Sequence, residues 1–165
     1  MRLPIATGIL VLAAGMLQAC QSVQSGTSSA KIASGEAAQA SAVPAPIDQT
    51  NRLREQARVY AARLNQGRCA TSPEGTSFDT TSNALERDLP ALKAGGIGGA
   101  PDPELAGEVE RTLAESRLDV GDAARTGGCP DVANTQYRIV LRAFPGAAHA
   151  AYRRRAEMGL SALQL

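Results

Sequence analysis

The residue with the clearest capacity for metal or acid–base chemistry is His149, the only histidine in the chain of 165 residues. A structural zinc site needs four ligands, and a single histidine cannot provide one without cysteines or carboxylates at ligand spacing. A Ser-His-Asp arrangement needs a nucleophile, and the chain contains no G-x-S-x-G nucleophile elbow. His149 lies in an alanine-rich helical stretch, where we expect it to be exposed or to cap a helix. The sequence therefore predicts a protein that is not an enzyme and that has no catalytic, cofactor-binding or metal-binding residues.

Three other groups of residues invite a chemical interpretation that their spacing does not support. The carboxylates around one amphipathic segment are typical of a solvated helix face: Glu104, Glu108, Glu110 and Glu115. The glycine-rich run Gly95–Gly99 lacks the Lys-Ser/Thr of a phosphate-binding loop, and no strand is predicted before it, so we expect a loop between helices. The consecutive Arg153–Arg155 turn by about 100° per residue around a helix and do not form one patch.

The N-terminal residues carry a more specific pattern. A basic start at Arg2 precedes an apolar run that is too short to span a bilayer, as is typical of a secretory signal peptide. The run ends in Leu17-Gln18-Ala19-Cys20, which resembles the lipobox of bacterial lipoproteins. This resemblance implies that residues 1–19 are removed and that the thiol of Cys20 is lipidated. The alternative is an ordinary cleavable signal, but such a signal ends in an A-x-A-like site, and Leu17 occupies its first small position.

Residues 20–47 form a second segment, rich in Ser, Ala, Gly, Gln and Pro. A segment with so few large apolar residues cannot bury enough surface to fold, and we expect a flexible tether with a reach of roughly 30 Å. By the same resemblance, Gln21 stands where enteric-type lipoproteins retained at the inner membrane carry aspartate. We therefore expect a cell-envelope protein that contacts the membrane through Cys20, on the periplasmic side of the outer membrane.

The export that this resemblance implies also bears on the other two cysteines. With Cys20 assigned to the lipid, Cys69 and Cys129 remain as an even pair in an oxidising compartment, and we expect them to form a disulfide. A bridge that closes a loop of about 60 residues contributes roughly 4 kcal/mol in the chain-entropy model. The alternative is two free buried thiols. No Cys-x-x-Cys motif is present, which favours a structural role over a catalytic one.

Composition predicts the fold class and excludes one kind of partner. The chain has 17 Lys+Arg and 16 Asp+Glu, so the part that follows a signal peptide containing Arg2 is formally neutral. Nucleic-acid binding normally needs a basic face, and we expect no nucleic-acid partner. With no tryptophan and few aromatic residues, alanine and leucine must form most of the core. This favours closely packed helices, and residues 48–165 are predicted to form a small all-α domain of about five helices.

Helical spacing of apolar residues places the first two helices. The first is predicted to start near Asp48–Asn51 and to bury Leu53, Ala57, Tyr60 and Leu64. Ala70–Thr80 is predicted to be a turn. A second helix is then predicted, with a capping box formed by Asn83 and Glu86 and a kink or break at Pro90.

Two further helices are predicted, one that runs into a helical hairpin and one that follows the hairpin. The sequence Asp102-Pro103 is a cap followed by a first-turn proline, and it starts a helix that buries Leu105, Val109, Leu113, Val120 and Ala124. This apolar stripe has a gap at Ser116 and Arg117. The last helix is predicted over Ala148–Leu163.

Residues 114–147 resemble a helical hairpin of the tetratricopeptide type, which repeats every 34 residues. Five positions carry the resemblance: Val120, Gly121, Ala133, Tyr137 and Pro145. It implies two antiparallel helices joined at Gly127-Gly128, with Tyr137 filling the space beside the small residues. The tryptophan and first tyrosine of the repeat are absent. Stable arrays need at least three repeats and the sequence shows one, so an ordinary helical bundle remains the alternative.

These expectations together favour a lipid-anchored protein-interaction module over an enzyme. We expect an adaptor or assembly factor for an envelope complex, which contacts its protein partner through a groove between the hairpin and its neighbouring helix. Two alternatives remain open at this stage. One is a stress or holdase chaperone of the envelope, and the other is a purely structural lipoprotein.

Overall fold

The computed structural model describes residues 45–95 and 101–164, and these residues form an all-α domain. The helices are α1 (Pro46–Leu64), α2 (Pro73–Ala94), α3 (Pro103–Thr126), α4 (Pro130–Ala143), the short 3₁₀ helix η1 (Ala147–His149) and α5 (Ala150–Ala162). The prediction of a small all-α domain with about five helices is confirmed. The signal peptide, Cys20 and nearly all of the tether lie outside the described residues, as do Gly96, Gly98 and Gly99 of the glycine-rich run.

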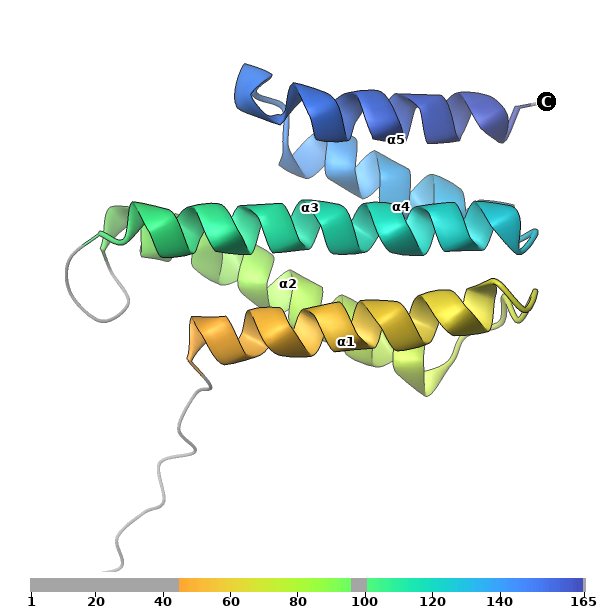
Figure 1. Cartoon of the computed structure of the whole chain (residues 1–165), viewed down its shortest axis with the longest axis horizontal. Helices are drawn as coiled ribbons and strands as arrows, with labels where there is room; N and C mark the ends of the chain where they lie inside the picture. The colour runs from red at the N-terminus through yellow and green to blue at the C-terminus, as the bar shows by residue number, and fades with distance from the viewer. Residues whose placement is uncertain (1–44, 96–100, 165) are drawn as a thin grey trace, which may run out of the picture. The chain divides into compact units, whose positions relative to one another are not determined.

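The five α-helices form two layers (Figure 1). Helices α1, α3 and α5 lie side by side in one layer, and α2 and α4 lie behind them. Helix α3 is central, because it packs against each of the other four α-helices. Within the described residues, α2 and α4 do not pack directly against one another.

Helix α1 starts slightly earlier than predicted. It begins at Pro46, where a proline in the first turn is well suited because its missing N–H has no partner in a helix start. The predicted stripe is correct, since Leu53, Ala57, Tyr60 and Leu64 are all buried.

The prediction of a turn over residues 70–80 is correct for residues 70–72 and wrong from Pro73 onward. Helix α2 starts at Pro73, and the Ser72 side chain caps it by accepting a hydrogen bond from the Gly75 backbone N–H at 3.2 Å. Ser72-Pro73 is thus a cap followed by a first-turn proline, the same pattern as Asp102-Pro103. No helix starts at Asn83 and Glu86.

Pro90 does not break helix α2, which continues to Ala94 and ends at Gly95 with a φ of 77°. Proline in a helix removes one hydrogen bond, here to the carbonyl of Glu86. Pro90 is exposed and close to the helix end, where the loss of one hydrogen bond interrupts little of the helix.

Helix α3 begins as predicted. The Asp102 side chain accepts a hydrogen bond from the Leu105 backbone N–H at 2.9 Å. Of the five expected core residues, Leu105 is half-buried. The other four are fully buried: Val109, Leu113, Val120 and Ala124. Ser116 and Arg117 are buried as well, although the sequence places them in a gap of the stripe.

Helices α3 and α4 form an antiparallel hairpin that is built around Tyr137 (Figure 1). A methyl group added at Gly121 would lie 2.8 Å from Cε1 of Tyr137, so the ring occupies the space that a side chain would need. Gly159 of α5 faces the same ring and has no room for a methyl group. Ala133 is fully buried, and α4 ends at Ala143, two residues before Pro145. The predicted last helix begins later than expected, because Ala147–His149 is a 3₁₀ turn.

The disulfide and a close backbone contact join the α1–α2 turn to the α3–α4 turn. Cys69 and Cys129 are bonded, with their Cα atoms 5.3 Å apart. Beside them, a methyl group at Gly127 would overlap the carbonyl oxygen and carbon of Leu64. The backbone of Gly127 has a φ of −81°, which any residue adopts, so the requirement for glycine there is steric.

The variant Gly127→Ala is expected to lower the free energy of unfolding by about 2–3 kcal/mol, because the neighbouring group is backbone and cannot turn away. Gly107→Ala is the matched control. Gly107 lies within α3 with no atom close enough to meet a methyl group, and the change is expected to stabilise the protein by about 0.5–1 kcal/mol. Urea unfolding followed by circular dichroism measures both. Equal effects of the two variants would contradict the close contact.

Candidate functional site

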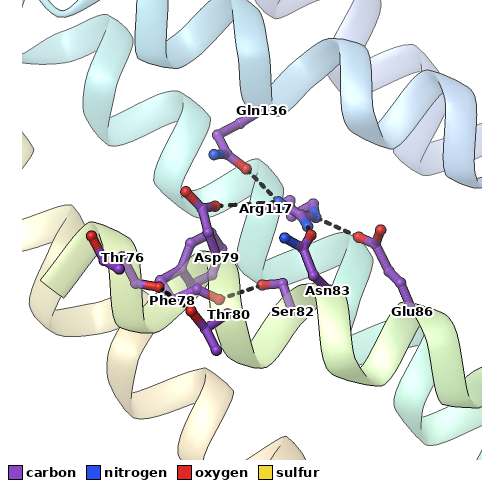
Figure 2. A network of polar contacts seen from close by, with 9 residues as sticks. All are labelled: Thr76, Phe78, Asp79, Thr80, Ser82, Asn83, Glu86, Arg117 and Gln136. Carbon is purple, nitrogen blue, oxygen red and sulfur yellow. Dashed lines mark hydrogen bonds and ion pairs between the residues drawn. The ribbon is translucent and has the colours of Figure 1, made fainter. Parts of the chain in front are cut away.

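A buried arginine lies where three helices meet (Figure 2). Arg117 of α3 is fully buried. It donates hydrogen bonds to Glu86 Oε1 at 2.7 Å and Asn83 Oδ1 at 3.2 Å, both on α2, and to Gln136 Oε1 on α4 at 2.9 Å. Its guanidinium lies 5.7 Å from the centroid of the Phe78 ring. The carboxylate oxygen Oδ1 of Asp79 lies 3.8 Å from Nη1 of Arg117.

The Arg117 network links helices that do not otherwise meet. Helices α2 and α4 are not packed directly, and Arg117 reaches both: Nη1 donates to Gln136 of α4, while Nε and Nη2 donate to Glu86 and Asn83 of α2 (Figure 2). Burial of an unpaired guanidinium would be very costly, so the partners on α2 and α4 must be in place when the domain folds. With no exposed surface of its own, Arg117 is a structural residue.

The sequence carries a signal for this network on one face of α2. Asp79, Asn83 and Glu86 recur at helical spacing and therefore share one face of α2. Asn83 and Glu86 were interpreted as a capping box, and Arg117 as a gap in an apolar stripe. Both features belong to one buried contact.

A second polar cluster joins α3, α4 and α5. Tyr137 Oη donates a hydrogen bond to Asp122 Oδ1 at 2.5 Å. The other oxygen of Asp122, Oδ2, accepts a hydrogen bond from Arg155 Nη2 at 2.6 Å. The same nitrogen donates a hydrogen bond to Asp119 Oδ1 at 2.8 Å. Burial of the phenol, together with its hydrogen bond to Asp122, raises the pKa of Tyr137 from 10.0 to about 12. Sequence patterns did not single out Asp122, and they marked Arg155 only as one of three consecutive arginines, because the pairing of these two residues depends on the packing of α5 against α3.

The raised pKa of Tyr137 predicts a loss of stability at alkaline pH. In the unfolded chain the phenol ionises near pH 10, whereas the folded protein retains the proton until about pH 12. The stabilisation is therefore fully present below pH 10 and is lost as the pH rises to 12, by about 1–2 kcal/mol. Urea unfolding at pH 8, 10 and 11.5 measures this.

Tyr137→Phe is the control for the alkaline loss. The variant is expected to be less stable at neutral pH, because the hydrogen bond to Asp122 is absent. Its free energy of unfolding should fall less than that of the wild type as the pH rises above 10. A part of the fall remains, since burial also raises the pKa of Tyr60 and Tyr152. An identical alkaline fall in both proteins would exclude Tyr137 as its source.

The carboxylates expected on a solvated face are not all solvated. Glu108 forms ion pairs with Arg54 of α1 and with Arg111, and Glu110 accepts from Lys93 Nζ of α2 at 2.5 Å. Their side chains are only 21% and 18% exposed. The prediction is wrong for these two, because α1 and α2 supply cations beside them. Glu104 and Glu115 are exposed, as expected.

His149 is neither exposed nor a side-chain cap, which corrects the prediction. Its ring meets Phe144 edge-on at 5.3 Å and stacks beside Tyr152 at 6.2 Å. Its Nε2 lies 3.8 Å from Glu110. It stands at the N-cap position of α5 but forms no capping hydrogen bond with its side chain. In residues 45–95 and 101–164, no three histidine, cysteine or acidic side chains are grouped so as to hold a metal ion.

The three consecutive arginines separate as predicted. Arg155 reaches the acidic residues of α3, whereas Arg153 donates to the carbonyl of Pro145 at 3.1 Å. Arg154 is exposed.

The candidate binding surface is an open groove of about 520 Å³ between α1 and α3. Ten residues line it, all from these two helices: Arg54, Ala57, Arg58, Ala61, Ala62, Asn65, Thr112, Glu115, Ser116 and Asp119. Its floor consists of alanine, threonine and serine, and longer charged side chains form its walls. The sequence predicts a contact surface between the hairpin and a neighbouring helix without naming that helix, and this groove lies between the hairpin helix α3 and α1.

The walls of the groove differ in charge. On α1, Arg54 binds Glu108 and donates to Thr112 Oγ1 at 2.9 Å, and Arg58 forms a pair with Glu55 on the same helix. On α3, Asp119 is paired with Arg155, while Glu115 forms no ion pair with any described residue. The α1 wall thus carries two arginines that are both ion-paired, and the α3 wall carries two carboxylates of which only Asp119 is paired.

Comparisons with known proteins leave the family open. The chain matches no family model, no curated protein sequence and no solved structure. Among the helices that the structure describes, none is both long enough and apolar enough to span a bilayer.

Proposed function

We propose that this protein is a lipid-anchored module of the bacterial envelope that binds another protein through the groove between α1 and α3. The observation that carries the proposal is the groove itself, which is open to solvent, has a floor of small side chains and has walls of opposite charge. Such a surface is suited to an extended or helical segment of a partner. An adaptor or assembly factor for an envelope complex needs a surface of this kind and no catalytic group.

The layered arrangement supports a tetratricopeptide-like domain. Helices α1–α2 and α3–α4 form two consecutive pairs, and α5 continues the layer of α1 and α3 (Figure 1). In repeat proteins of this type, stacked helix pairs form one continuous core and present an extended binding surface. The disulfide and the Arg117 network hold the two pairs together, which offers a physical reason why a short array is stable.

The anchor is proposed from the sequence and is supported by the disulfide. Leu17-Gln18-Ala19-Cys20 matches a lipobox, and a structural disulfide is typical of exported proteins. Lipidated Cys20 and the tether that follows it would then hold the domain at the membrane. Gln21 favours the outer membrane, on its periplasmic side.

The groove is tested by blocking it. Ala62 is exposed and lines the groove, and Ala62→Trp places an indole in it. Ala143→Trp, at an exposed alanine near the end of α4, is the matched control. The proposal predicts that partner co-purification from envelope extracts is lost with Ala62→Trp and retained with Ala143→Trp. Equal retention by both variants would contradict a role for the groove.

The anchor is tested by the mass of the mature chain. Wild-type protein from membranes should begin at Cys20 and carry the added mass of acyl chains. Cys20→Ser should leave the signal uncleaved or produce an unacylated soluble chain. A wild-type protein that is cleaved elsewhere and carries no lipid would refute the anchor while leaving the groove untouched.

The chaperone alternative has less support. A holdase would expose a contiguous apolar patch to its clients. Among the described residues, the large apolar side chains that are well exposed are Ile47 and Val59 on α1 and Met158 on α5.

A further inference from the structure

We propose that the partner segment in the α1–α3 groove is an extended peptide carrying a lysine or arginine side chain, which Glu115 and Asp119 bind. This inference rests on the proposed function and adds the chemistry of the occupant. It depends on three features of the groove: the short side chains of its floor, an unpaired hydroxyl and the acidic wall.

The floor of the groove allows a close approach by a peptide backbone. Ala57 and Ala61 of α1 and Ser116 of α3 line the groove with short side chains, whereas Thr112 is hydrogen-bonded to the guanidinium of Arg54. Larger residues on the two helices point elsewhere, into the core or along the walls. An extended chain can therefore lie along the floor with its own side chains directed to the walls.

Ser116 supplies a hydroxyl group in this floor that forms no hydrogen bond with any described residue. The residue is only 4% exposed, and it lines the groove. Its hydroxyl has no hydrogen-bond partner among the residues that the structure describes, in contrast to Ser82, whose hydroxyl donates to the carbonyl of Phe78 at 2.8 Å. The Ser116 oxygen is not one of the fully buried side-chain atoms without a partner among the described residues, so it is open to water in the groove, which a bound group would replace. A carbonyl of a bound peptide backbone would accept its proton.

The acidic wall selects a basic side chain. Glu115 and Asp119 are four residues apart and share one face of α3, where like charges repel. Asp119 is paired with Arg155 but is still 60% exposed, and Glu115 has no ion pair with any described residue. A lysine or arginine between them would be attracted by both carboxylates.

The test is a selection of random 12-residue peptides, displayed on phage, against the full-length chain. Enriched peptides are then synthesised, and their affinity is measured by fluorescence anisotropy. The inference predicts that they share at least one lysine or arginine. Glu115→Gln combined with Asp119→Asn should weaken their binding about tenfold, as expected from two partly exposed charge pairs.

The matched control is Asp131→Asn combined with Glu157→Gln. It removes the same number of charges from exposed carboxylates outside the groove and should change affinity less than twofold. Circular dichroism verifies that each variant is folded. Peptides without basic residues, an equal loss in both double variants, or no enrichment at all would overturn the inference.

The variant Ala62→Trp distinguishes a failure of the basic-peptide inference from a failure of the proposed function. If enriched peptides lack basic residues but no longer bind Ala62→Trp, the groove binds peptides of another chemistry and only the present inference is wrong. If binding is unaffected by Ala62→Trp, the groove is not the binding surface and both proposals fail.

Discussion

Replacing Arg117 with alanine is expected to lower the free energy of unfolding by about 3–5 kcal/mol, the cost of breaking a buried charged contact by removing one partner. The variant loses hydrogen bonds to Glu86, Asn83 and Gln136 and leaves a cavity beside Phe78. A typical domain has about 5–15 kcal/mol of stability in total, so this is a large fraction. Urea unfolding monitored by circular dichroism measures the loss.

A series at position 117 separates charge from geometry. Arg117→Lys keeps the charge but cannot reach α2 and α4 together, because the ammonium group lacks the planar fork. Arg117→Met keeps most of the volume but has no charge. If the fork is what matters, lysine should recover little of the lost stability. A lysine variant as stable as wild type would contradict the role of Arg117 in joining the two helices.

Removing the disulfide is expected to cost up to about 4 kcal/mol, by the chain-entropy estimate for a loop of this length. The bridge spans 60 residues and joins the α1–α2 turn to the α3–α4 turn. The variant that combines Cys69→Ser with Cys129→Ser should unfold at a clearly lower urea concentration than wild type.

Reduction provides the control for the disulfide. Wild-type protein treated with dithiothreitol should unfold like the double serine variant, and dithiothreitol should not affect that variant. A wild-type protein with unchanged stability after verified reduction would show that the packing of Gly127 against Leu64 suffices to hold the two turns together.

Features that depend on local sequence were predictable. The buried faces of α1 and α3 follow from apolar residues at helical spacing, because such a face must be covered. The start of α3 at Asp102-Pro103 follows from a cap and a first-turn proline. The same pattern at Ser72-Pro73 was missed because Pro73-Glu74-Gly75 also has the composition of a turn. A local pattern that fits two structures is decided by packing, here by Gly75 lying against Tyr60.

Features that depend on distant contacts were not predictable from spacing. In the sequence, Arg117 only interrupts the apolar stripe of α3. Its role as a buried link follows from its contacts with Asn83 of α2 and Gln136 of α4, which depend on how the helices pack. The same is true of Asp122, whose partners Tyr137 and Arg155 lie on two other helices. The pairing of Cys69 with Cys129 was predictable from a residue count, since only one pair remained once Cys20 was assigned to the lipid.

The lining of the groove could also not be predicted without the layered arrangement of the helices. Sequence patterns predicted a contact surface beside the hairpin but not its lining. Helices α1 and α3 lie side by side with α2 behind them (Figure 1), and Arg58 of α1 and Glu115 of α3 both line the groove between them. The charges of the two walls come from helices that are far apart in the chain.

Photo-cross-linking in living cells tests the central claim most directly. A photoreactive amino acid is placed at Ala62 in the groove and, as a control, at Ala143 on α4, and the captured proteins are identified by mass spectrometry. The account predicts one or two dominant envelope proteins captured at position 62 and little at position 143. The same broad mixture of unrelated proteins at both positions would contradict a specific binding groove between α1 and α3 and would favour a chaperone.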